Sequence, residues 1–395
     1  MLFRSLLRLS YQDLSSGLSI DSCDFFSDFN LLVGISGAGK TSILKAISNL
    51  KRIANGESIN GVKWDVEFLT NDHVRYHWLG EFEVKKARSL IKIEGDEVNS
   101  NDSENKVSII SETLLKDQEV LIERNQEVIE FKNSKTPKLA SYLSCIELFN
   151  QEEDVFPVRQ EFNKMVFNPL KFNISSSTLD KIFRNYEYAQ YNSLSELQSS
   201  QLPISDKLLI TYKKYPDTFE IIKRKFLDIF PQFEDLKIQF LEPLKLGDLI
   251  VSSNIIGLLE ELPRIQIKEK NSHVWIVEPN ISSGMIKSLM FLATIELSPD
   301  GSVILIDEFE NSLGVNCLDT LTEDLLVNYR DLQFIITSHH PYIINNISPA
   351  YWKIVTRKGG VIQVHNAADF HISKTRQKAF IDLINVLEEF PQGIS

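Results

Sequence analysis

The stretch that decides the fold is FNLLVGISGAGKTS, residues 29–42. It starts with a mainly apolar run that is typical of a buried strand, and apolar residues at helical spacing follow between positions 43 and 50. Between them, Gly34 to Thr41 fits the pattern G-x-x-x-x-G-K-[ST]. Glycines let such a loop wrap closely, so that successive N–H groups and the helix N-terminus point at a phosphate. We therefore predict a strand, a phosphate-binding loop and a helix.

This loop carries the first set of candidate site residues. We expect Lys40 to reach the β- and γ-phosphates of a nucleotide and Thr41 to hold Mg²⁺. The alternative is a glycine turn with an incidental lysine, but a chance match in a chain of this length is roughly one in a hundred. The residues expected to contact the nucleotide are Gly34, Ser36, Gly37, Ala38, Gly39, Lys40, Thr41 and Ser42.

A second motif is SVILIDEFE at residues 302–310, an apolar run that ends in Asp307 and Glu308. Ligands of open α/β sheets bind at the carboxyl edge of the strands. We expect Asp307 to join the Mg²⁺ shell and Glu308 to polarise the attacking water. Taken alone, the motif fits an ordinary strand end equally well, and it gains weight from the phosphate loop upstream.

Two weaker motifs also contain residues that could contact a phosphate at the end of a strand or the start of a helix. In QFIITSHHP at 333–341, His339 would lie at a strand end beside the γ-phosphate, although a histidine there is more often structural. In NISSGMIKS at 280–288, Ser282 could cap a helix whose N-terminus Gly284 opens to an anion. The simpler alternative is a plain N-cap.

Composition limits the class of protein. The chain has 395 residues, enough for two to three structural units, and its 43% hydrophobic and 24% charged residues are typical of a globular protein. A net charge of −12 argues against a constitutive DNA coat. No apolar stretch approaches the roughly 20 residues of a membrane span, and no signal segment is evident. Three scattered cysteines indicate a reducing compartment, so we expect a cytoplasmic protein.

The acidic charge is uneven, which suggests a modular chain. Residues 81–154 hold 10 basic and 17 acidic side chains, whereas residues 1–60 hold 6 and 5. Six short β-like runs between 62 and 135 predict an antiparallel meander with a hairpin tip at 95–106: VEFL, VRYHW, EFEV, SLIKI (89–93), EVLIE and EVIEF. Helical periodicity predicts a helix at 218–230. Further helices are expected at 283–297 and 317–329. We expect four parts: 1–60 and 263–395 as two halves of one head, 61–154 as a β-rich acidic subdomain, and 155–262 as a mainly helical insertion.

The order of these motifs resembles the ABC-type ATPase heads. Within them it is similar to the RecF/SMC-like branch of the AAA-15/AAA-21 ATPases, the OLD family and the ATPases of Septu- and PARIS-type phage-defence systems. The resemblance covers residues 1–50 and 265–345. It implies an α/β P-loop NTPase fold with an antiparallel β subdomain and an inserted helical subdomain.

The resemblance assigns further roles. Ser282 and Gly284 match the LSGGQ-type signature, which in that family completes the ATP site of a second protomer, with Ser283 in place of its first glycine. Residues 311–313 match the D-loop, with Gly314-Val315 in place of its usual His-Pro, and His339 matches the switch histidine. Gln118 and Gln151 both stay open as the Q-loop glutamine.

These roles imply that ATP and Mg²⁺ bind one subunit and are capped by residues 282–284 of another in a homodimer or larger homo-oligomer, which hydrolysis through Glu308 reopens. About 50 residues follow His339, too few for the Toprim nuclease of OLD proteins, so we expect a defence ATPase that controls a separately encoded effector, with a nuclease as the expected effector. The alternative is a RecF-type DNA-repair clamp, with basic candidates at 221–230 and 237–240. If the protein is not such a clamp, we expect any contact with nucleic acid to be indirect. A transporter head or a nucleotide-locked scaffold is less consistent with the sequence.

Overall fold

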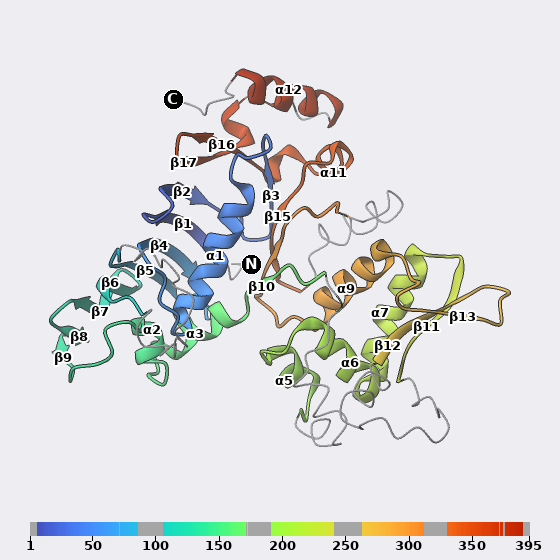
Figure 1. The fold of residues 1–395 in the computed structure, drawn as a ribbon, viewed down its shortest axis with the longest axis horizontal. Helices are drawn as coiled ribbons and strands as arrows, with labels where there is room; N and C mark the ends of the chain where they lie inside the picture. The colour runs from blue at the N-terminus through green and yellow to red at the C-terminus, as the bar shows by residue number, and fades with distance from the viewer. Residues whose placement is uncertain are drawn as a thin grey trace, which may run out of the picture. The chain divides into compact units, whose positions relative to one another are not determined.

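A computed structural model of the chain describes residues 6–70, 72–85, 106–170, 172, 191–240, 263–311, 330–370, 372–373 and 376–389. The chain divides into two compact units, and each is described by itself (Figure 1). The first unit comprises residues 1–167, 301–309 and 328–395, and the second comprises 168–300 and 310–327. The expected four-part division of the chain stays a prediction.

The first unit is built on a set of parallel strands. In the order β10-β14-β15-β3-β16 these five strands run in one direction. Every residue of β3, β14 and β15 is buried, which explains why these segments are nearly continuous apolar runs. Because the strands are parallel, their carboxyl ends share one edge. The bounds are β10 Val166–Phe167, β14 Val303–Ile306, β15 Gln333–Thr337, β3 Phe29–Val33 and β16 Trp352–Lys358.

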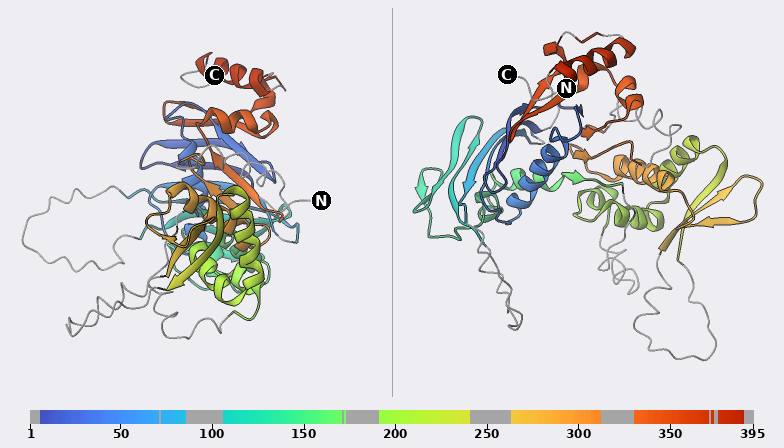
Figure 2. Two further views of the ribbon diagram at one scale, coloured as in Figure 1. Left: turned by 90° about the vertical axis from the view of Figure 1, so that its right-hand side faces the viewer. Right: turned by 45° about the horizontal axis from the view of Figure 1, so that its top comes forward.

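Helix α1 (Lys40–Ala54) follows β3 and packs against this sheet (Figure 2). Its residues Ile43, Leu44, Ile47 and Leu50 are completely buried, as their helical spacing predicts. They belong to one apolar core with residues from β1, β14, β15, β16 and β17. Burial of an amphipathic face of this size stabilises the helix far more than local propensity does.

The sheet continues from β16 as an antiparallel extension. After the β16–β17 hairpin, β17 pairs in parallel with β2, and the remaining strands are antiparallel in the order β2-β1-β4-β5-β6-β7-β8-β9. Strands β4 to β9 of this extension are the antiparallel meander expected from the sequence, and β1 and β2 add to it. The bounds are β17 Val361–Asn366, β2 Leu18–Asp24, β1 Leu6–Asp13, β4 Val62–Leu69, β5 Arg75–Phe82, β6 Ile109–Lys116, β7 Glu119–Asn125, β8 Ile129–Phe131 and β9 Ser134–Lys135.

Two details of the meander differ from expectation. The runs VRYHW and EFEV, predicted as separate strands, are one strand, β5, because Gly80 between them packs directly against the ring of Trp64 without breaking the ladder. The sequence did not predict β6, because Glu112 occupies one of its inward positions and breaks the apolar alternation. The expected strand at 89–93 and residues 95–105 of the expected hairpin tip lie outside the described residues.

Glu112 is buried because it has a complete set of partners. Its carboxylate accepts hydrogen bonds from the Trp78 indole (2.9 Å) and the Cys145 backbone N–H (2.8 Å), and it lies 3.6 Å from the Arg124 guanidinium. Arg124 also donates to the carbonyl oxygens of Leu143 and Ala140. Burial nevertheless raises the pKa of Glu112 above its ordinary value, since desolvation disfavours the charged form.

Helices complete the first unit. Short helices join the meander to β10, and others follow β15 and β17 near the end of the chain (Figure 1). No helix among the described residues is both long and apolar enough to cross a membrane. The bounds are α2 Cys145–Leu148, α3 Phe156–Asn163, α11 Pro341–Asn346 and α12 Arg376–Glu389, with short 3₁₀ turns at Pro349–Tyr351 and Ala367–Phe370.

The second unit combines helices with a small antiparallel sheet. Helix α9 (Ser283–Leu297) packs against α6 and α7 and is buried from Ser288 to Leu297. Lys225 of α7 forms a 3.0 Å ion pair with Glu296 of α9. Helices α7 and α9 confirm the helices expected at 218–230 and 283–297. The other bounds are α5 Leu194–Ser199, α6 Ile204–Lys214, α7 Pro216–Ile229, β11 Phe233–Phe240, β12 Pro263–Glu269 and β13 Trp275–Val277.

Replacing Arg124 with methionine tests the buried pair. The change leaves the Glu112 carboxyl buried without its cation, and we expect a loss of about 3–5 kcal/mol of unfolding free energy at pH 8. The matched control is Arg52→Met, because Arg52 and Glu57 form a pair whose side chains are 51% and 54% exposed. That control should cost less than about 1 kcal/mol. Urea unfolding followed by tryptophan fluorescence measures both.

The loss of stability caused by Arg124→Met should depend on pH. The folded-state pKa of Glu112 is raised, so the folded protein keeps a proton that the unfolded chain loses near pH 4.5. Stability then falls as pH rises above that value. Arg124→Met should therefore be less destabilising at pH 4.5 than at pH 8, and an equal cost at both would contradict this explanation.

Candidate nucleotide site

The phosphate loop connects β3 to α1 at the carboxyl edge of the parallel strands. Helix α1 begins at Lys40, and its N-cap residue, Gly39, has no side chain with which to cap the first N–H groups. The loop is tightened by a hydrogen bond from the Ala38 N–H to the Ile35 carbonyl (3.2 Å), while residues 35–37 are exposed. Exposed backbone donors at an uncapped helix N-terminus are an arrangement suited to a phosphate group.

Two glycines of the loop are required by its packing. A Cβ on Gly34 would lie 2.3 Å from the Val355 carbonyl oxygen of β16. Gly39 has φ +103, a left-handed conformation, and a Cβ there would lie 2.3 Å from the Ile362 side chain of β17. The loop is thus seated directly on the β16–β17 hairpin, and larger residues at either position would displace it.

Lys40 is held above the loop rather than in solvent. Its ammonium donates to the carbonyl oxygens of Gly34 (2.8 Å) and Ile35 (3.0 Å), and the residue is only 4% exposed. These contacts restrain the long side chain at the start of α1. The positive charge is therefore positioned where the loop would receive phosphates.

A chain of hydrogen bonds links the phosphate loop to the two carboxylates. The Thr41 hydroxyl lies 3.0 Å from Asp307 Oδ1, and the Thr337 hydroxyl donates to the same oxygen (2.7 Å). The Thr337 hydroxyl also accepts from the Glu308 backbone N–H (2.7 Å). Three segments far apart in the sequence thereby meet at one edge. The sequence did not mark Thr337 as a site residue, although its place in the T-S-H-H-P motif was a signal.

Glu308 has an unusual backbone conformation. Its φ is +49, which is uncommon for a residue with a side chain. The Thr337 hydroxyl holds its N–H, and the next N–H, from Phe309, donates to the Thr337 carbonyl (3.0 Å). Phe309 is fully buried and anchors this turn, whereas Glu308 is exposed. Strain held in this way is common at functional sites.

The two histidines after β15 have different environments. The His340 ring accepts a hydrogen bond from the Tyr342 N–H (3.2 Å) and caps helix α11, so its role is structural. His339 is exposed just beyond the end of β15. This difference supports the choice of His339 as the residue that contacts a ligand.

The chemistry of this edge fits the groups that the sequence implies. Thr41 and Asp307 offer a hydroxyl and a carboxylate oxygen 3.0 Å apart, and Mg²⁺ prefers oxygen ligands. The glycine loop offers backbone donors and Lys40 a cation, which match the phosphates of a nucleotide. These residues could hold MgATP together.

The signature residues lie in the second unit. Ser282 caps α9 by accepting a hydrogen bond from the Met285 N–H (3.3 Å), which is the simpler alternative noted from the sequence. Ser282 and Ser283 are exposed and Gly284 is partly exposed. One turn along the helix, Lys287 donates to the Asn311 carbonyl. This bond ties the signature helix to the start of the expected D-loop.

Several elements and residues expected near the site either lie elsewhere or fall outside the described residues. The expected helix at 317–329 and D-loop residues 312–313 lie outside the described residues. Gln118 is at the β6–β7 turn, seven strands away from β3 in the sheet, and Gln151 is in the turn between α2 and α3. The Q-loop glutamine therefore stays unassigned.

Comparison with known proteins also supports an ATPase, the class of protein that the motifs indicate. Residues 163–345 match the family described as "AAA domain, putative AbiEii toxin, Type IV TA system". The chain is 24% identical over 224 residues to the "Retron Ec83 probable ATPase" of Escherichia coli, an alignment that covers 56% of this chain and 36% of that protein. The chain thus spans about a third of the length of this curated relative. These matches support a P-loop ATPase.

The solved structures to which the chain is similar include head domains of SMC proteins. The SMC head domain from Thermotoga maritima has a TM-score of 0.41 and 14% identity, with 91% of this chain and 98% of that chain covered. A Pyrococcus furiosus Smc head domain bound to the C-terminal domain of ScpA has a TM-score of 0.45 and 13% identity, with 98% and 100% covered.

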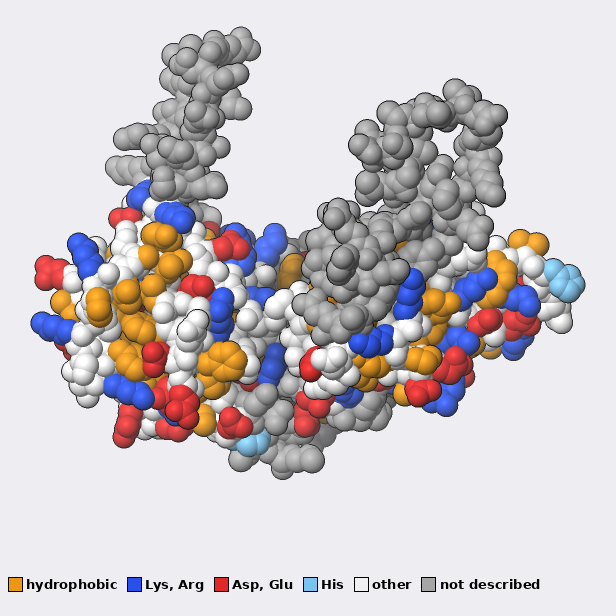
Figure 3. Space-filling model, turned by 90° about the horizontal axis from the view of Figure 1, so that it is seen from below, with side chains coloured by type: hydrophobic (Ala, Val, Ile, Leu, Met, Phe, Trp, Pro, Cys, Tyr) orange, Lys and Arg blue, Asp and Glu red, His pale blue; other side chains and the backbone are white. Residues whose placement is uncertain are grey.

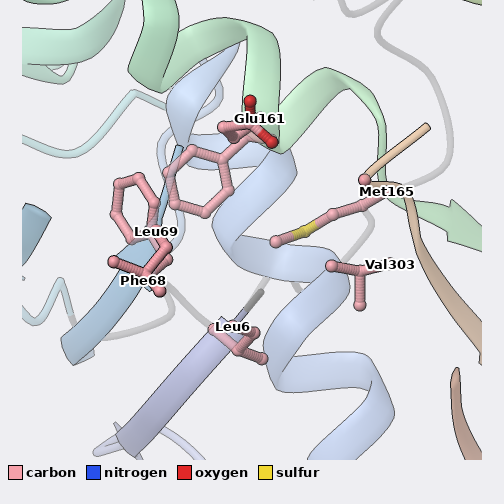
Figure 4. Close-up of a pocket in the computed structure, with 8 residues that line it drawn as sticks. Leu6, Phe68, Leu69, Glu161, Met165 and Val303 are labelled. Carbon is pink, nitrogen blue, oxygen red and sulfur yellow. The ribbon is translucent and has the colours of Figure 1, made fainter. Parts of the chain in front are cut away.

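An apolar pocket in the first unit lies away from this edge. Its lining includes Leu6, Phe68, Met165 and Val303 (Figure 4). Val303 begins β14, whereas Asp307 follows the end of that strand. Glu161, the one carboxylate of the lining, pairs with Lys164 at 2.9 Å. The pocket therefore has no part in the site at the carboxyl edge.

Replacing Thr337 with valine tests the hydrogen-bond chain. Valine keeps the shape but removes the hydroxyl that holds Asp307 and the Glu308 N–H. We expect Mg²⁺-dependent phosphate release from ATP to fall 10- to 100-fold, as is typical for residues that orient metal ligands. The control Thr337→Ser keeps the hydroxyl and should stay within a few fold of the native rate. Equal rates for the valine and serine variants would show that the hydroxyl has no such role.

Proposed function

We propose that this chain is an ATP-binding and ATP-hydrolysing protein whose nucleotide-driven association of two heads controls a separate effector in defence against phage. The observation that carries the proposal is the hydrogen-bond chain from Thr41 through Asp307 and Thr337 to Glu308. It assembles the phosphate loop, the metal-binding carboxylate and the candidate catalytic base at one edge. The matches to an AAA family and to a retron ATPase support the same reading.

The roles of the residues follow from their positions. The loop from Gly34 to Ser42 and the Lys40 ammonium would bind the phosphates and neutralise their charge. Thr41 and Asp307 would hold Mg²⁺, which supplies further charge neutralisation when bound. Glu308, exposed beyond the end of β14, would accept a proton from the attacking water, and His339 would orient that water or contact the γ-phosphate.

Association of two heads would complete the site. Ser282, Ser283 and Gly284 at the start of α9 form a second candidate anion-facing element, and the sequence resemblance assigns it to the nucleotide of a partner copy. The bond from Lys287 to the Asn311 carbonyl supports a coupling between this element and the segment just after Glu308. Contact with the partner's nucleotide would thereby influence the catalytic turn.

Control of an effector is the finer part of the proposal. Its support is the name of the E. coli relative, which places that protein in a retron. The uneven charge is a second line of support, since residues 81–154 hold 17 acidic and 10 basic side chains. We propose that the effector is a nuclease with a basic docking surface.

Direct clamping of DNA has less support. Three of the four basic residues expected to form a groove are already engaged, and the fourth, Arg224, is exposed. Lys223 lies 3.0 Å from both Glu220 and Asp235, Lys225 pairs with Glu296, and Lys237 lies over the Trp275 ring at 3.9 Å. On the face shown in Figure 3, acidic and basic side chains of the described residues are interspersed. This pattern is unlike a groove that tracks a phosphate backbone.

A Glu308→Gln variant tests head association. Removing the base should preserve nucleotide binding but prevent turnover, so ATP should convert the monomer into a dimer of twice the mass. Light scattering after gel filtration, with and without MgATP, measures this. The double variant Glu308→Gln/Ser282→Arg should still bind ATP and stay monomeric, because the arginine would block the partner's nucleotide. An unchanged mass of Glu308→Gln in ATP would rule out association through nucleotide.

Co-purification tests control of an effector. The tagged chain, expressed from its native locus, should recover a nuclease encoded beside it, and ATP should change the amount recovered. The control is Lys40→Ala, which should lose the ATP dependence because the loop no longer holds phosphates. Recovery of no effector under either condition would count against this part of the proposal while leaving the ATPase intact.

A further inference from the structure

The tip of the β16–β17 hairpin stands beside the phosphate loop. Strand β16 runs parallel to β3 as its direct neighbour, and the register places Ile354 opposite Val33 (Figure 1). Val355 is therefore level with Gly34, where the loop leaves the sheet. Strand β16 continues to Lys358 before the chain turns back into β17. Its last residues thus lie beyond the edge of the sheet, at the height of the loop.

One side chain of this tip, Arg357, lies on the face of the sheet that carries the loop. Arg357 is directly opposite Ile362 in the antiparallel pair, so both project from the same face. Ile362 and Val355 belong to the core that contains the buried side of α1, which identifies the face. Ile362 also contacts Gly39, the last glycine of the loop. Arg357 is therefore the cross-strand neighbour of a residue that touches the loop.

The guanidinium of Arg357 is positioned but unpaired. The residue is exposed, and its Nε donates to the Gly359 carbonyl at 3.0 Å, which holds the side chain over the hairpin tip. Within the described part of the chain, no acidic side chain forms an ion pair with it. Other arginines of the first unit differ in this respect. Those paired with a carboxylate are Arg8, Arg52, Arg75, Arg124 and Arg159.

The order of the strands indicates which end of a bound nucleotide would lie on which side of the loop. Asp307 and Glu308 follow β14 and His339 follows β15, and both strands lie on one side of β3. The reacting γ-phosphate belongs on that side if these residues act on it. The other end of the nucleotide, its base, must then extend across the loop toward the opposite neighbour of β3. That neighbour is β16, one strand spacing of about 4.8 Å away, and it carries Arg357.

We propose that Arg357 is a nucleotide-binding residue that stacks its guanidinium on the base of the nucleotide whose phosphates occupy the loop. The guanidinium is planar and weakly hydrated, so it packs well against an aromatic ring. The inference rests on the nucleotide site proposed above and extends it to the base. Arg357 would contribute affinity for the nucleoside portion, while the loop and Lys40 bind the phosphates.

Calorimetric titration with ADP and with inorganic tripolyphosphate tests this assignment. In Arg357→Ala, ADP binding should weaken roughly three- to thirty-fold, the range expected for loss of a cation–π contact. Tripolyphosphate binding should stay unchanged, because it has no base. Arg357→Lys keeps the charge but loses the planar group that stacks on the base, so it should restore the ADP affinity only in part. All variants should melt like the native protein, since the side chain is exposed.

Lys358→Ala is the matched control. It removes an equally exposed cation from the next position, which projects from the other face of the hairpin, and it should bind both ligands normally. Unchanged ADP affinity in Arg357→Ala would overturn the inference. Weaker tripolyphosphate binding in that variant, restored by Arg357→Lys, would also overturn it and indicate a phosphate contact instead. If the native protein binds neither ADP nor tripolyphosphate, the proposed nucleotide site itself fails.

Discussion

The parallel alignment of β14, β15, β3 and β16 is the constraint on which the rest of the structure depends. Parallel strands end at a common edge, so the residues that follow each strand are brought together whatever their distance in sequence. Thr41 and Asp307 are 266 residues apart, yet their side-chain oxygens lie 3.0 Å from each other. A shift of a single residue between β14 and β15 would move Asp307 away from Thr337. The register of these strands therefore sets the geometry of the site.

Close packing explains how the edge stays in place. The phosphate loop sits directly on the β16–β17 hairpin, with Gly34 against Val355 and Gly39 against Ile362. Interiors packed this closely do not deform gradually, and the loop has little room to move toward the sheet. The turn at Glu308 is restrained in a different way. Thr337 binds the Asp307 carboxylate and the Glu308 backbone N–H by hydrogen bonds, so these two neighbouring residues share one anchor.

Strands of the first unit differ in how well apolar patterns in the sequence predict them. Apolar runs correctly indicated β3, β14 and β15, because strands buried on both faces leave a continuous signal. The same reasoning missed β6, where a glutamate faces the core, since its partners Trp78 and Arg124 are supplied by neighbouring strands. It divided β5 in two at Gly80, which only the packing of Trp64 explains. Such departures arise wherever a residue's environment comes from distant parts of the chain.

The sequence by itself determined the α/β class, the phosphate loop and the candidate roles of Lys40, Asp307, Glu308 and His339, because these follow from local patterns and from a recognisable order of motifs. The tertiary structure alone decided which residues meet. It brought Thr337 to Asp307, separated the capping role of His340 from His339, and placed Arg357 opposite Ile362, which lies against Gly39. The reason is physical. Strand order and register determine which residues lie close in space. Neither can be inferred from the local sequence around the residues that meet.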